Sequence, residues 1–194
     1  AYFMRGYSGD VCQQAGNVVD ATMRTYREAM KGLLPTPSKS HYTFNLRDFS
    51  RVVQGVLLQA PSGEFANKSS VMRLWTHEAL RVFGDRLTDD NDRKWMCGHA
   101  ATMCKEIFRC DFQSEFEHIR PAEETKPGYG TLRRLFWGDY MTPADEDDRP
   151  YVEVRDLQLL QNRTEDSLAE FNQTSKKPME LVMFMFAIEH VSRC

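Results

Sequence analysis

The sequence SHYTFNLRDFSR, residues 40–51, predicts the start of a helix. Asn45 is a typical N-cap, because its side-chain oxygen can accept a hydrogen bond from an amide that has no partner within the helix. Asp48 follows three residues later, where the helix dipole stabilises a carboxylate. The apolar residues that recur at helical spacing and predict a buried face are Phe49, Val52, Val53, Val56 and Leu57.

Arg47 therefore lies in the first turn of a capped helix, and this position allows two interpretations. A guanidinium there can bind a phosphate, and the amides at the start of the helix add positive potential. Arg47 can also be an ordinary first-turn arginine that pairs with a carboxylate, which is the more common case because helix starts are many and phosphate sites few. The residues alone leave both interpretations open.

Two consecutive motifs, residues 33–39 (LLPTPSK) and 41–48 (HYTFNLRD), closely resemble dynein heavy chains, axonemal ones in particular. The resemblance continues through residues 75–87 and 135–141 to the ending EHVSR at 189–193, and covers about residues 11–193. Trp137 and Pro150 depart from the family pattern. The resemblance implies that the segment is the end of the third AAA+ module of the motor ring, with Arg47 at the sensor II position of its lid.

Helical periodicity continues along most of the chain, so the fold class is mainly α. Beyond the Arg47 helix, the predicted helices are residues 10–34, 70–87, 88–108, 150–172 and 178–193. Pro61 and Gly63 predict a turn, and Pro150 suits the first position of a helix. The first helix is expected to bury an apolar stripe that includes Val19 and Met30. The helix at 70–87 is expected to carry a polar face, formed by His77, Glu78, Arg81, Asp85 and Arg86.

The resemblance implies an AAA+ small (lid) helical subdomain followed by a helical connector. Residues 1–110 would be the lid of the third module with the end of its large subdomain, and residues 111–177 the connector. Residues 145–148 form an acidic approach to the connector helix. Residues 178–194 would be the first helix of the fourth module, ending shortly before its phosphate-binding loop.

The composition is that of a globular protein, with 41% hydrophobic and 27% charged residues and a net charge of −3. This balance gives no reason to expect nucleic acid or a membrane as a partner. The five cysteines are scattered, which favours free thiols in a reducing compartment. Cys97, His99, Cys104 and Cys110 are the only group that resembles metal ligands, but their spacing within one amphipathic helix favours buried thiols, so no metal site is expected.

The sequence contains no G-x-x-x-x-G-K-[ST] loop, so it offers no nucleotide cradle of its own. The resemblance nevertheless implies part of an ATP-driven microtubule motor of the cytoskeleton and ciliary axoneme. ATP or ADP with magnesium would bind the complete module, and the fragment alone would be neither catalytic nor ligand-bound. Neighbouring AAA+ modules would be direct partners, and microtubules and dynein intermediate and light chains would be partners of the full motor.

A different class of function also fits the residues. A helix that is apolar on most sides near the end of the chain could bind the groove of a partner, in a free-standing helical interaction domain.

Overall fold

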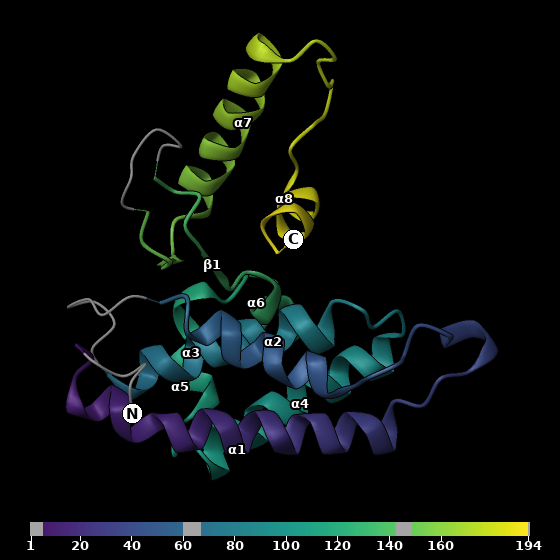
Figure 1. Ribbon diagram of the computed structural model, residues 1–194, viewed down its shortest axis with the longest axis vertical. Coiled ribbons are helices and arrows are strands. Elements are labelled where there is room, and N and C mark those ends of the chain that lie inside the picture. Colours follow the sequence, from purple (N-terminus) through teal and green to yellow (C-terminus); the bar gives the residue numbers. More distant parts are fainter. Residues whose placement is uncertain (1–5, 60–66, 143–148, 194) are drawn as a thin grey trace. The chain divides into compact units, whose positions relative to one another are not determined.

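The computed structural model describes residues 6–59, 67–142 and 149–193. These ranges are mainly helical, as the sequence predicts, with one two-stranded sheet (Figure 1). The chain divides into two compact units, residues 1–132 and 133–194. The elements of the first are α1 (Gly9–Gly32), the 3₁₀ turn η2 (Pro37–Lys39), α2 (Leu46–Val56), α3 (Lys68–Ala79), the π-helical turn η3 (Leu80–Gly84), α4 (Asp90–Glu106), α5 (Phe112–Phe116), the 3₁₀ turn η4 (Glu117–Ile119) and α6 (Tyr129–Arg133), which reaches the first residue of the second unit.

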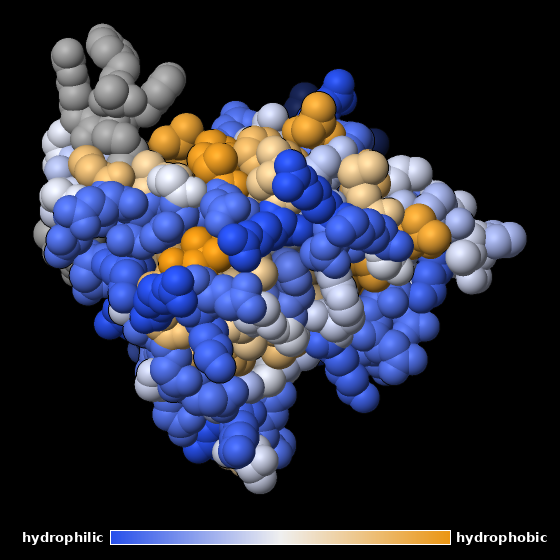
Figure 2. Space-filling view, turned by 90° about the horizontal axis from the view of Figure 1, so that it is seen from below, coloured by the Kyte–Doolittle hydropathy of each residue, from blue (hydrophilic) through white to orange (hydrophobic). Residues whose placement is uncertain are grey.

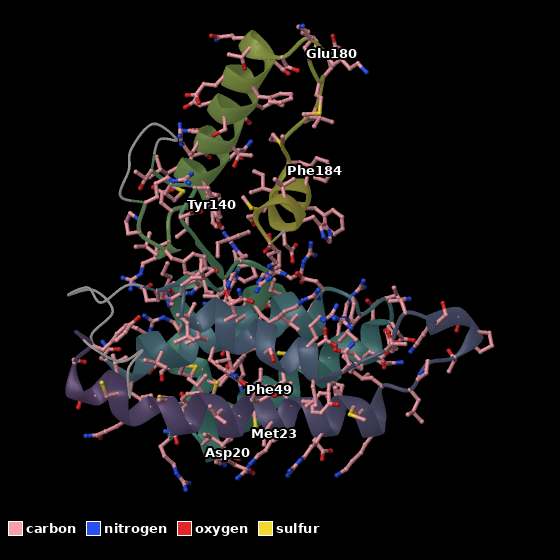
Figure 3. The ribbon with its side chains drawn as sticks, in the orientation of Figure 1. Asp20, Met23, Phe49, Tyr140, Glu180 and Phe184 are labelled. Atoms are coloured by element: carbon pink, nitrogen blue, oxygen red, sulfur yellow. The ribbon has the colours of Figure 1, made fainter. Side chains whose placement is uncertain are left out.

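In the first unit, α1, α2 and α3 pack against one another pairwise, and α3 is the most buried of the three. Every residue of α3 from Ser70 to Ala79 is buried. Trp75 is fully buried, and its indole Nε1 donates a hydrogen bond of 3.0 Å to the Thr22 hydroxyl of α1. Phe49 lies on the side of α2 that faces α1 (Figure 3). The apolar face predicted for α2 therefore packs against α1 and α3, except at its end, where Leu57 is 43% exposed.

The buried face of α1 differs from the expected stripe. Val19 and Met30 are about half exposed. Small and hydroxyl residues are buried in their place, namely Ala21, Thr22, Thr25 and Ala29. The two threonine hydroxyls donate to the carbonyl oxygens four residues earlier, at 2.6 and 2.8 Å, so their burial leaves no donor unsatisfied. Short side chains let α1 approach the large Trp75. Apolar periodicity alone does not predict this close approach.

The expected polar face of the third helix is wrong for two of its residues. His77 and Glu78 are 1% and 0% exposed. The charge of Glu78 is compensated inside the unit, because Arg81 donates two hydrogen bonds to Glu78 Oε2, at 2.9 and 2.8 Å. A carboxylate can be buried where a guanidinium pairs with it in this way.

The second unit contains β1 (Phe136–Gly138), β2 (Val152–Val154), α7 (Leu157–Thr174) and α8 (Met185–Ser192). The strands are antiparallel, and Trp137 pairs with Glu153. A core of its own fills this unit, formed by Phe136, Val154, Leu160 and Ile188.

The prediction of a helix from Pro150 is wrong at its start. Residues 152–154 form β2, since the β-branched Val152 and Val154 suit a strand that pairs with β1. The helix begins only at Leu157, where the Asp156 side chain accepts hydrogen bonds from the amides of Gln158 and Leu159.

The prediction of a helix from residue 178 is also wrong at its start. Asn172 holds the backbone of Met179 through two hydrogen bonds, one accepted and one donated, at 2.8 and 2.9 Å. This contact keeps the following residues out of a helix. The helix α8 begins at Met185, and Phe184 lies at its N-cap position (Figure 3).

Two sequence predictions lie outside the described residues: the turn at Pro61 and Gly63, and the acidic run at residues 145–148. Within the described ranges, none of the helices combines the length and the apolar character that crossing a bilayer requires. Figure 2 shows a face on which hydrophilic side chains surround separate apolar patches.

Candidate functional site

The start of α2 is closed by a reciprocal capping box. The Asn45 side chain accepts a hydrogen bond from the Arg47 amide at 2.8 Å, and the Asp48 carboxylate accepts one from the Asn45 amide at 2.9 Å. The Asn45 carbonyl also accepts the Asp48 amide at 3.0 Å. This confirms the N-cap predicted at Asn45, and it gives Asp48 a hydrogen-bonding role beyond its favourable place in the helix dipole.

Arg47 projects from this first turn as an exposed residue. Within residues 6–59, 67–142 and 149–193, its guanidinium has no hydrogen bond or ion pair. The alternative of a first-turn arginine paired with a carboxylate is therefore not what these residues form. The Arg47 amide already donates its hydrogen bond to the Asn45 side chain. An anion at this helix start would therefore be bound mainly by the guanidinium, assisted by the helix dipole.

The carboxylate next to Arg47 is held by other cations. Asp48 is only 2% exposed, and its Oδ1 accepts a hydrogen bond from Arg86 Nη2 at 2.9 Å. Arg51 Nη1 lies 3.8 Å from the same oxygen. The sequence does not predict the pair of Asp48 and Arg86, since 38 residues separate the two and no local spacing signals the contact.

Arg86 also contacts the segment that leads into α2. Its Nη1 donates to the Thr43 carbonyl at 3.2 Å, and its guanidinium lies 5.0 Å from the centre of the Phe44 ring. The Phe44 ring in turn stacks on Phe83, with ring centres 5.7 Å apart. A second contact joins the same segments, because His41 Nε2 lies 2.8 Å from the Arg86 carbonyl oxygen.

The cysteine and histidine side chains of α4 and of the segment after it do not converge on a common point. His99 lies against Thr25, Cys104 Sγ lies 3.2 Å from the Met72 sulfur, and Cys110 Sγ lies near the Phe108 carbonyl. Burial raises the pKa of Cys104 to about 12 and that of Cys97 to about 11, so both thiols stay protonated at neutral pH. Among the residues that the structure describes, no cluster of three or more ligating side chains could hold a metal ion.

The region that contains this helix start matches a known family. Residues 4–93 match the model of the ATPase lid domain of dynein heavy chains. Arg47, its capping box and Arg86 all lie within the matched range.

Individual relatives extend the similarity over the rest of the chain. The sequence is 45% identical over 177 residues, 91% of the chain, to dynein axonemal heavy chain 12 of Homo sapiens. It is 42% identical over 200 residues to the Mus musculus protein of the same name, and 43% identical over 192 residues to dynein axonemal heavy chain 3 of Homo sapiens. These alignments include 100% and 99% of the chain. The chain spans only about 5–6% of the length of these curated relatives.

Proposed function

The chain belongs to the dynein heavy chain family, and we propose that its first unit acts as the lid of the third AAA+ module, where Arg47 binds the terminal phosphate of the nucleotide. The observation that carries this proposal is the exposed guanidinium of Arg47, which has no partner among the described residues and stands at the positive end of α2. A cation that is held at a helix start and left unpaired suits an anionic ligand.

The residues of this site fit one part of a nucleotide. The guanidinium can donate two parallel hydrogen bonds to the oxygens of a phosphate. The sequence contains no phosphate-binding loop of the G-x-x-x-x-G-K-[ST] type, so the phosphate cradle and the magnesium ligands would come from elsewhere in the module. In this proposal the chain senses ATP or ADP and does not hydrolyse it.

The relatives support the wider setting of this proposal. They are axonemal heavy chains, which favours an ATP-driven microtubule motor in the cytoskeleton of the cilium. The neighbouring AAA+ modules would be the direct partners, and microtubules and the intermediate and light chains would be partners of the assembled motor. A lid that moves as a rigid body with the bound nucleotide can pass its state to the next module.

Substitution of Arg47 tests the proposal. We expect Arg47→Ala to weaken ATP binding at the third module of the complete motor ring by about 1.5–3 kcal/mol, the usual size of a hydrogen bond to a charged group. The measurement is the nucleotide dissociation constant of that module in the ring.

Arg51→Ala is the matched control. Arg51 lies one turn further along α2, its side chain is 54% exposed, and its contact with Asp48 is long at 3.8 Å. The control should leave ATP affinity within about twofold of the parent. An Arg47→Ala variant that binds ATP as tightly as the parent would remove Arg47 from the phosphate site and leave only the family assignment.

The second unit bears on the alternative of a free-standing interaction domain. Apolar side chains stand exposed before and in α8, among them Leu181, Val182, Phe184 and Phe186 at 52–81% exposure. We infer that these residues pack against the fourth module of the same chain. Limited proteolysis of residues 178–186 distinguishes the two functions, because the segment should be protected in the complete ring without any added partner.

A further inference from the structure

We propose that Arg86 is a positioning residue that holds the first turn of α2, and with it Arg47, in place. The inference rests on the function proposed above for Arg47. A guanidinium can meet a phosphate reliably only where the backbone that carries it is held in place. Arg86 itself is not proposed to contact the nucleotide.

Asp48 is buried at the start of α2. This carboxylate is 2% exposed and is the acidic member of the capping box. A buried carboxylate is costly unless a cation and hydrogen-bond donors satisfy it. Arg86 supplies the closest cation, at 2.9 Å, and Arg51 lies much further away, at 3.8 Å.

The side chains next to Arg47 bury little apolar surface. Leu46 is 64% exposed, Arg47 is exposed and Phe44 is only partly buried. Apolar burial therefore contributes little to the residues that flank Arg47. The Arg86 guanidinium covers the Phe44 ring and bonds the Thr43 carbonyl, so one side chain connects to positions 43, 44 and 48.

The backbone at Arg86 is itself held in place by hydrogen bonds. It follows the π-helical turn η3, where the amide of Asp85 bonds the Leu80 carbonyl at 2.9 Å. The amide of Leu87 bonds the Gly84 carbonyl at 2.9 Å, and Leu87 is 2% exposed. A side chain that starts from such a backbone can fix the element that it contacts.

The experiment is a double-mutant cycle in the complete motor ring, with Arg47→Ala, Arg86→Ala and the two substitutions together. ATP affinity of the third module is measured for each, and amide hydrogen exchange is followed in a peptide that covers residues 44–50. Arg24→Ala is the matched control, because Arg24 pairs with Asp20 of α1 and Glu106 of α4 and not with the start of α2. Arg86→Lys keeps a cation opposite Asp48 and covers the case in which Arg86→Ala folds poorly.

We expect Arg86→Ala to accelerate exchange at residues 46–49 and to weaken ATP binding about fivefold to tenfold. In the Arg47→Ala background it should weaken binding no further, and Arg86→Lys should restore part of the affinity. Equal losses in both backgrounds, unchanged exchange at residues 46–49, or the same exchange change in Arg24→Ala would overturn the proposal.

The cycle also separates this proposal from the function of Arg47. If Arg47→Ala leaves ATP affinity unchanged, the sensor function fails, and the exchange rate at residues 46–49 alone then decides the role of Arg86. Faster exchange in Arg86→Ala supports its positioning role, and unchanged exchange refutes it.

Discussion

His99 connects two helices of the first unit. Its Nε2 lies 3.1 Å from the Thr25 hydroxyl of α1, and its ring stacks on Trp95 with centres 5.2 Å apart. Burial lowers the pKa of His99 below its ordinary value of 6.5, while the carboxylates of Glu28 and Glu106 act in the opposite direction. The neutral imidazole is therefore the form that the fold favours.

This lowered pKa predicts a loss of stability in mild acid. Below pH 6.5 the unfolded chain binds a proton at His99 that the folded chain binds only at lower pH, so the free energy of unfolding should fall as the pH drops from about 7 through the lowered pKa. Urea denaturation at several pH values measures the effect. His99→Gln retains a group that can bond Thr25 but does not titrate, and it should show a smaller decrease; an unchanged pH dependence in this variant would contradict the assignment.

The residues around Arg47 show which contacts the sequence could predict. Asn45 and Asp48 signal their role locally, because a capping box depends on residues three positions apart. Arg86 gives no such signal, since its partner Asp48 is distant in the sequence and many arginines pair with carboxylates on their own helix. The exposure of the Arg47 side chain could not be predicted from the sequence either, because it depends on how the helices pack.

At the scale of elements, α2 and α3 approach closely at Gly55. A Cβ atom added there would lie 1.9 Å from Glu78 Oε2 and 2.3 Å from its Cδ. Glu78 cannot easily move aside, because it is 0% exposed and is held by two hydrogen bonds from Arg81. The absence of a side chain at Gly55 is therefore what allows a buried carboxylate to lie between the two helices.

We expect Gly55→Ala to destabilise the protein by about 1–3 kcal/mol, the typical cost of overpacking a core. Chemical denaturation measures this change. Gly98→Ala in α4 is the control: a Cβ there meets nothing within 4 Å, and alanine favours a helix over glycine. The control should be neutral or stabilising, and equal losses for the two variants would show that the contact with Glu78 is not the cause.

The boundaries of the last two helices show where periodicity fails. Val154 falls on the apolar stripe of the helix predicted at residues 150–172, yet it pairs with Phe136 in the sheet. A three-residue strand is too short to show the alternation of side chains that predicts a strand. Its partner strand is also distant in the sequence, so no local pattern indicates that the two pair. The extended residues before α8 depend in the same way on one side chain, Asn172, that is distant from the helix start.

At the scale of the whole molecule, the mainly helical class follows from the sequence, and the division into two units does not. Residues 1–132 and 133–194 each bury a core of their own. The expected module boundaries at residues 110 and 177 come from a family resemblance, and they stay a prediction. The place of the lid within a ring of modules likewise comes from the family resemblance, because no pattern in this chain predicts it.

The measurement that decides the role of Arg47 is a structure of the complete motor ring with ATP bound at the third module. We predict that the Arg47 guanidinium lies within hydrogen-bond distance, about 2.7–3.2 Å, of an oxygen of the terminal phosphate, with Asp48 still paired to Arg86. A terminal phosphate held by other residues, with the Arg47 guanidinium turned to solvent or to a carboxylate, would contradict the proposal.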